Sequence, residues 1–139
     1  MRPLLKKVSE LGLVPIVHTN AESNLEAVWR LERLALEFPE LTFVAMDALT
    51  TNVNSQVVLD IAKRTPNILF DTAHVRSSGY VRQFVETVGS HRLVFGSLFY
   101  SYPASYEHCA TLGEVKAAKI GEEDKANILW LNAKSLFRL

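Results

Sequence analysis

The sequence predicts an α/β fold in which four parallel β-strands alternate with α-helices. Short apolar runs that suit buried strands recur along the chain, and each is followed by a stretch whose apolar residues have helical spacing. This alternation is typical of βαβ units, whose right-handed crossovers make successive strands parallel in one sheet. Polar residues also stand at or just after the ends of these runs. The carboxyl edge of the sheet is therefore the expected place for a ligand.

The chain begins with a predicted helix and a first strand. The helix is amphipathic and ends near Gly12, because glycine suits the left-handed residue that closes a helix; its apolar side carries Leu4, Leu5 and Val8. Residues 13–18 are a short apolar run and are predicted as a strand. Pro15 has no N–H to donate, which favours an edge position for this strand.

The next two elements are a helix and a second strand. Apolar residues recur at helical spacing over 25–38, and Pro39 ends that helix. Residues 41–46 are predicted as the second strand, which stops at a polar residue. A polar loop over 50–54 then leads to a helix whose apolar residues lie within 57–62.

Two further units complete the pattern. Residues 68–70 are predicted as the third strand, and the following helix has its apolar residues within 81–88. The fourth strand is predicted over 93–95 and is followed by a helix around 106–118. Acidic residues from Glu122 onward suit the start of a final helix that runs to the C-terminus. The chain is thus expected to form a single domain over residues 1–139.

Composition excludes some classes of function. The 139 residues include 15 basic and 15 acidic side chains, and no basic block is interleaved with aromatic residues, so nucleic acid is not an expected partner. No apolar segment is long enough to span a membrane, so a membrane is not an expected partner. Cys109 is the only cysteine, which fits a reducing cytoplasm; we expect it to be a buried structural thiol rather than a nucleophile paired with its neighbour His108.

Five candidate site residues lie at or just after the predicted strand ends. They are His18, Asp47, Asp71, His74 and Ser97. Because the carboxyl ends of parallel strands meet at one edge, these side chains are expected to cluster. Asp47 and Asp71 are the candidate catalytic residues because of this position, although each could instead cap a helix or a turn.

A second candidate feature follows the third strand. His74 lies in a loop with Arg76, Ser77 and Ser78, a combination that could hold an anionic group near the start of a helix. His74, Arg76 and Ser97 are therefore the candidate substrate-binding residues, with a solvated loop as the alternative. His91 and Arg92 precede the fourth strand at the opposite edge, where both are expected on the surface.

Five segments, in order, resemble the second half of amidohydrolase-related, metal-dependent hydrolases of the amidohydrolase 2 type. Residues 13–18 are similar to the fifth barrel strand, 38–47 to the sixth, 67–72 to the seventh, 92–97 to the eighth and 128–137 to the last helix. The resemblance implies half of a TIM-type (β/α)8 barrel, a fold that usually needs ~250 residues. It also implies amide, lactone or related carboxylate substrates and a divalent metal such as zinc or manganese.

The resemblance carries the metal site over incompletely. His18 matches a metal-binding histidine, and Asp47 stands at the position of a second one. Leu98 stands where the family has a metal-bound aspartate, and the first-strand His-x-His pair has no counterpart. A catalytic zinc needs about three protein ligands, so one chain with His18 and Asp47 as its metal ligands is expected to have reduced or lost catalysis, or to bind no metal.

A half barrel leaves two strand edges and one sheet face to be covered. The expected solution is a homodimer in which two copies complete the barrel and share a symmetric site. Alternation counted from His18 and Asp47 predicts Val14, Ile16, Phe43 and Ala45 on the inner face. The alternative function is a non-catalytic scaffold, formed by that homodimer, that binds a small anionic ligand or serves in assembly. Whether the chain is an enzyme is left open by the sequence.

Overall fold

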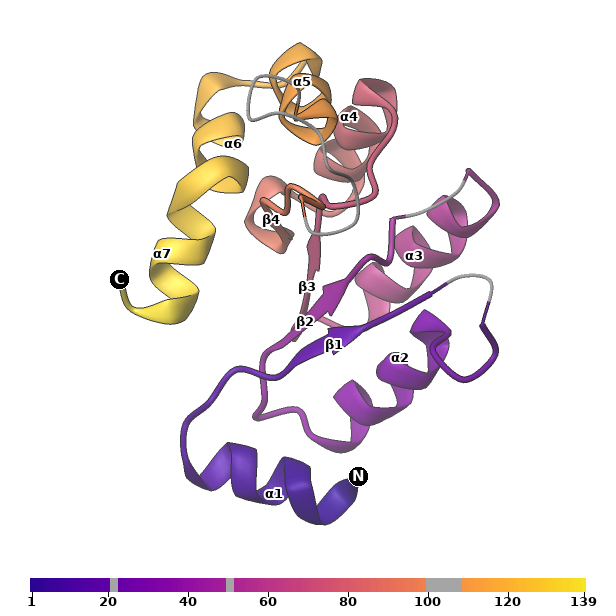
Figure 1. Ribbon diagram of the computed structural model, residues 1–139, viewed down its shortest axis with the longest axis vertical. Coiled ribbons are helices and arrows are strands. Elements are labelled where there is room, and N and C mark those ends of the chain that lie inside the picture. The colour runs from indigo at the N-terminus through magenta and orange to yellow at the C-terminus, as the bar shows by residue number, and fades with distance from the viewer. Residues whose placement is uncertain (21–22, 50–51, 100–108) are drawn as a thin grey trace.

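The computed structural model describes residues 1–20, 23–49, 52–99 and 109–139. In the first half of the chain, α1 (Arg2–Glu10) leads to β1 (Ile16–His18), α2 (Val28–Glu37) leads to β2 (Phe43–Met46), and α3 (Asn52–Arg64) leads to β3 (Ile68–Asp71). Figure 1 shows this alternation of strands and helices along the chain.

The second half begins with α4 (Ser78–Thr87), a 3₁₀ turn η1 (Ser90–Arg92) and β4 (Leu93–Val94). It continues with α5 (Ala110–Ala117). A final helical stretch then comprises α6 (Glu122–Ala126), the π-helical segment η2 (Asn127–Leu131) and α7 (Asn132–Phe137). The predicted element order is therefore confirmed, with shifts at the boundaries. Residues 52–54 are helical rather than loop, and residues 106–108 of the predicted fifth helix lie outside the described ranges.

The four strands form one parallel sheet in the order β1-β2-β3-β4. The α/β class with four parallel βα units is thus confirmed. Each strand lies next to its neighbour in sequence, so all strand carboxyl ends meet at one edge of the sheet, here called the rim. Among the described strands, β1 and β4 have a neighbour on one side only.

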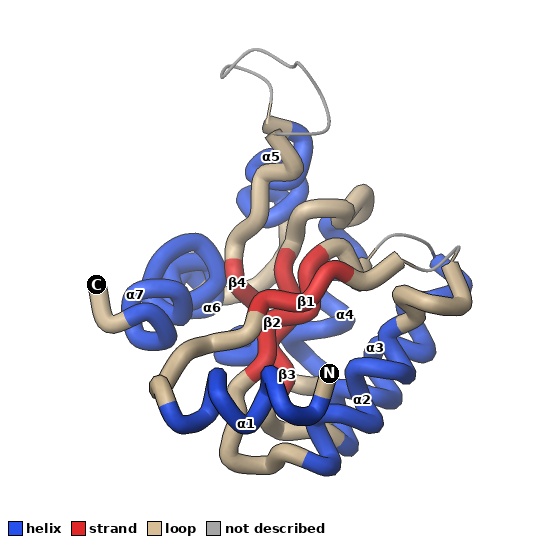
Figure 2. Tube along the Cα trace, turned by 60° about the horizontal axis from the view of Figure 1, so that its bottom comes forward, coloured by secondary structure: helices blue, strands red, loops and turns tan. Residues whose placement is uncertain are grey.

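A helical layer covers one face of the sheet. Figure 2 shows α2, α3 and α4 together on the same side of the strands. Their apolar residues join those of the strands in one core; the largest fully buried side chains include Phe43, Phe70, Phe84, Leu59, Ile61 and Ile68. Burial of each such side chain contributes roughly 1.5–3 kcal/mol, so this core holds the helical layer against the sheet.

The prediction of the inner face is wrong for β2. Phe43 and Ala45 are fully buried in the core beneath the helices, and it is Val44 that pairs in register with Ile16. The alternation depends on Asp47 as its reference, but Asp47 has a φ of 65° and does not continue the extended strand. A residue in the left-handed region breaks the two-residue period on which the count depended.

The expectation that Arg92 lies on the surface is also wrong. Arg92 is 6% exposed, whereas His91 is exposed as predicted. The Arg92 guanidinium donates to the backbone oxygens of Ala62, Thr65 and Ile68. It therefore closes the carboxyl end of α3 and the turn into β3, where carbonyl groups lack helical partners. Burial lowers the pKa of Arg92 to about 10.

In the described part of the chain, the helices are all too short or too polar to cross a bilayer.

Candidate functional site

Four of the predicted site residues meet at the rim of the sheet. His18 ends β1, Asp47 follows β2, Asp71 ends β3 and His74 lies in the loop after β3. The strands are parallel and adjacent, so their carboxyl ends share one edge of the sheet. These polar groups therefore converge although they are far apart in sequence. The predicted clustering of His18, Asp47, Asp71 and His74 agrees with this arrangement.

Asp47 is the centre of this cluster. Its side chain is 3% exposed, and its Oδ2 lies 3.4 Å from His18 Nε2 and 3.7 Å from His74 Nε2. Two imidazoles from different strand-end segments thus face one carboxylate oxygen. A carboxylate placed in this way attracts either ring when that ring is protonated.

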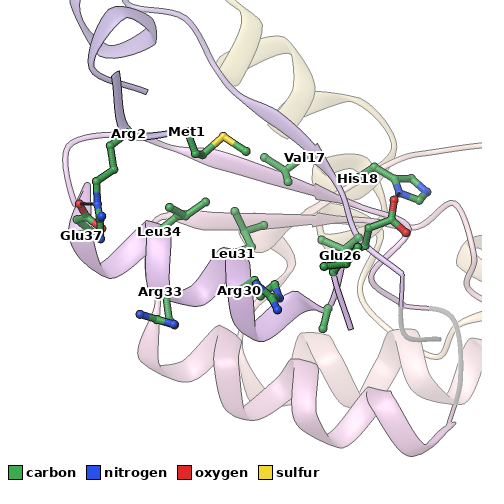
Figure 3. Close-up of a pocket in the computed structure, with 13 residues that line it drawn as sticks. Met1, Arg2, Val17, His18, Glu26, Arg30, Leu31, Arg33, Leu34 and Glu37 are labelled. Carbon is green, nitrogen blue, oxygen red and sulfur yellow. Dashed lines mark hydrogen bonds and ion pairs between the residues drawn. The ribbon is translucent and has the colours of Figure 1, made fainter. Parts of the chain in front are cut away.

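His18 has a second acidic neighbour that the sequence analysis missed. Its Nδ1 lies 3.3 Å from Glu26 Oε1, so both ring nitrogens of His18 face carboxylates. Figure 3 shows Glu26 reaching His18 from the segment before α2. The sequence shows that Glu26 is an acidic residue between β1 and α2. It does not show that Glu26 lies next to His18, because packing sets the path of that loop.

Asp71 holds the backbone of Asp47 in place through a hydrogen bond. Its Oδ1 accepts a hydrogen bond from the backbone N–H of Asp47 at 2.9 Å and another from Ala73 N at 3.4 Å. The first bond holds the left-handed backbone at Asp47, a conformation that aspartate adopts more readily than most residues other than glycine and asparagine. Asp71 therefore positions Asp47 through its backbone.

The environment of Asp71 disfavours its charge. Burial, together with repulsion from Asp47, raises the pKa of Asp71 to about 6, while the hydrogen bonds from Asp47 N and Ala73 N oppose the increase. Asp71 therefore titrates near neutral pH, a property common at functional sites.

Gly96 makes room for the Asp71 carboxylate. A Cβ at Gly96 would lie 2.8 Å from Asp71 Oδ2 and 3.2 Å from Ala73. Thr72 fixes this glycine by accepting from Gly96 N at 3.0 Å, and Thr111 Oγ1 donates to Gly96 O at 3.1 Å. Segments from β3, β4 and α5 are thereby joined directly beneath the site.

The remaining predicted residues lie at the surface. Arg76 and Ser97 are exposed, and Ser97 Oγ accepts from Phe99 N at 3.3 Å. The start of α4, which the sequence suggested for an anion, is contacted by the protein itself: Glu114 Oε2 accepts from Ser78 N at 2.6 Å. An internal carboxylate thus occupies the position that an anion would take.

A catalytic metal fits this site poorly. No three His, Cys, Asp or Glu side chains within residues 1–20, 23–49, 52–99 and 109–139 are placed to hold one ion. Leu98, which stands at the expected aspartate position, is 4% exposed and has no electron pair to donate. The described residues of one chain therefore offer the His18–Asp47 pair but not the roughly three protein ligands that a catalytic zinc requires.

The chain is similar in fold to TIM-barrel proteins and in sequence to one amidohydrolase family. Solved TIM-barrel proteins share the fold, and the amidohydrolase family Amidohydro_2 matches residues 1–139. The chain therefore belongs to the amidohydrolase 2 family. Among curated protein sequences, none matches the chain significantly.

Several solved structures align with nearly the whole chain. 5-Carboxyvanillate decarboxylase LigW from Sphingomonas paucimobilis aligns at a TM-score of 0.73 and 18% identity, covering 99% of this chain and 52% of that one. The TIM-barrel protein Bb4693 from Bordetella bronchiseptica aligns at a TM-score of 0.71 and 19% identity, covering 99% of this chain and 50% of that one. A dihydroxybenzoic acid decarboxylase from Polaromonas sp. JS666 was solved with manganese and 2-nitroresorcinol. It aligns at a TM-score of 0.68 and 15% identity, covering 99% of this chain and 53% of that one. The chain thus spans about half the length of these proteins and has half of a TIM-barrel fold.

Proposed function

We propose that this chain binds a small carboxylic acid at the rim through His18 and His74, with reduced or lost metal-dependent turnover. The observation that carries the proposal is that Asp47 Oδ2 lies 3.4 Å from one imidazole and 3.7 Å from the other. Two imidazoles oriented by a buried carboxylate can bind an acid and move a proton to or from it. The poor fit to a metal supports assigning this chemistry to the side chains themselves.

Aromatic carboxylic acids are the first ligands to test. The names of the similar structures include 5-carboxyvanillate and dihydroxybenzoic acid, which support this class as a starting point. Titration of the protein with 2,6-dihydroxybenzoate, followed by the NMR signals of the imidazole C–H groups, should shift His18 and His74. His91 is the internal control, because it is exposed within η1, at the edge of the sheet opposite the rim. Equal shifts at all three histidines, or none, would contradict the proposal.

A second candidate is a homodimer that completes the barrel and binds zinc or manganese between two copies. It is favoured by the open edge of β1, where Ile16 is 55% exposed. Two copies would bring two His18 and two Asp47 side chains, enough to coordinate a metal if they converge on one axis. Light scattering combined with elemental analysis tests this: about one metal per dimer, lost in His18→Ala, supports it, whereas a metal-free monomer excludes it.

A further inference from the structure

A cavity of about 450 Å³ lies between β1, α2 and the start of α1. Figure 3 shows its walls, with Val17 on one side and the α2 side chains on the other. Its volume is within the range of small-molecule sites. The residues that matter for its chemistry are Val17, Arg30, Leu31, Arg33, Leu34 and Glu37.

The interior of the cavity is apolar. Val17 comes from β1, and Leu31 and Leu34 come from adjacent turns of α2 on the side facing the strand. Leu31 is 2% exposed, so the base of the cavity is formed by the core itself. This surface suits a hydrocarbon or aryl body, which gains free energy when it leaves water.

The border of the cavity is positively charged. Its two carboxylates are already engaged: Glu26 lies 3.3 Å from His18 Nδ1, and Glu37 pairs with Arg2 at 2.5 Å. Arg30 donates to the Asn24 carbonyl oxygen and lies over the Trp29 ring, but it pairs with no carboxylate among the described residues. Arg33 likewise forms no ion pair in the described part of the chain. No carboxylate among the described residues forms an ion pair with either guanidinium, although Glu37 attracts Arg33 at longer range.

The start of α2 adds to this positive potential. Ala27 occupies the N-cap and has no side chain to accept a hydrogen bond, and no acidic residue lies in the first turn. Unsatisfied amide groups at a helix start favour an anion nearby. Arg30 lies in that first turn, so the helix and the guanidinium act on the same region.

We propose that this cavity binds a small amphipathic organic anion, with its apolar body on Val17, Leu31 and Leu34 and its acidic group at Arg30 and Arg33. This site goes beyond the proposed function, which depends on His18 and His74, with Asp47 between them, at the rim. The two sites share His18 and its neighbour Glu26, which border the cavity at one end.

Octanoate is a suitable probe, with octan-1-ol as its uncharged counterpart. Isothermal titration calorimetry on the full chain should show that octanoate binds at least several-fold more tightly than octan-1-ol. Arg33→Ala should weaken octanoate binding about tenfold, the usual loss for one charge-assisted hydrogen bond, and leave octan-1-ol binding unchanged. Arg82→Ala, on α4 and away from the cavity, is the matched control. Leu34→Trp should block both ligands by filling the cavity.

Three outcomes overturn the proposal. They are no heat with octanoate at millimolar concentration, equal affinity for the two probes, and an Arg33→Ala variant that binds like the wild type. Octanoate affinity that falls as protein concentration rises would identify a second copy of the chain as the occupant and would also contradict it. Asp47→Asn separates the two proposals, because it should abolish the response of His74 to a rim ligand while octanoate binding persists.

Discussion

At the scale of single residues, the site depends on a left-handed backbone at Asp47. The residue has a φ of 65°, and its N–H is held by the Asp71 carboxylate, which in turn occupies space left by Gly96. This short series of contacts directs Asp47 Oδ2 toward both imidazoles. Changes at Asp71 and Gly96 are therefore expected to affect the histidines without touching them.

Asp71→Asn is expected to remove a pH dependence of stability. The pKa of Asp71 is raised from 3.8 to about 6, so between these values the folded state keeps a proton that the unfolded state has lost. Stability therefore falls as pH rises through this window, by up to about 3 kcal/mol above pH 6. Asparagine can still accept from Asp47 N but does not ionise. Urea unfolding at pH 4, 5, 6 and 7 should show the decline in the wild type alone; parallel profiles would contradict this reasoning.

Gly96→Ala is expected to destabilise the protein by about 1–3 kcal/mol, because the new methyl group would lie 2.8 Å from Asp71 Oδ2. The NMR signals of His18 and His74 should shift with it. Gly113→Ala is the matched control: it lies within α5, its Cβ would meet nothing within 4 Å, and alanine favours a helix. Thermal unfolding of both variants measures the difference, and equal stability would argue against the packing role of Gly96.

At the scale of secondary structure, buried polar side chains join elements that the apolar core alone would not align. Arg92 connects β4 to the end of α3 and the start of β3. Asn132 of α7 donates to the carbonyl oxygens of Ser90 and Leu93 at 2.8 and 2.7 Å, which attaches the final helix to β4. Both contacts lie at the edge of the sheet opposite the rim and keep the strands in register beneath the site.

Arg92→Lys is expected to cost about 2–4 kcal/mol. Lysine keeps the charge but lacks the planar group that donates to several carbonyl oxygens, so buried acceptors would lose their partners. Denaturant unfolding measures the change. Arg82→Lys, exposed on α4, should stay within about 0.5 kcal/mol. A similar small effect at Arg92 would show that water replaces these hydrogen bonds.

At the scale of the whole molecule, one strand edge and the surfaces beside it remain apolar. Ile16 on β1 is 55% exposed, and Leu4, Leu11 and Leu13 nearby are 62%, 58% and 55% exposed. An uncovered apolar strand edge favours pairing with another strand. This supports the proposal that two copies associate, whether or not they share a metal.

Ile16→Lys is expected to abolish such association. A charged side chain at the centre of an edge strand cannot be buried in an interface without a large loss of free energy. Light scattering at micromolar concentration should show a dimer for the wild type and a monomer for the variant. Leu36→Lys, on an exposed position of α2, should stay dimeric. A monomeric wild type would contradict the homodimer directly.

The order of elements, the parallel sheet and the position of the rim were all predictable from the sequence. They depend on local periodicity and on the right-handed crossover, and both can be read without knowing which residues touch. His18, Asp47, Asp71 and His74 could be nominated for the same reason, because strand ends are visible as the ends of apolar runs.

Tertiary structure alone decided the role of each residue. The left-handed turn at Asp47 reversed the predicted face of Phe43 and Ala45, and burial of Arg92 turned an expected surface residue into a buried donor. Glu26 reached His18 and Glu114 reached Ser78 across segments distant in sequence. Such contacts depend on the paths of loops and on packing between elements, which the local pattern of a sequence does not encode.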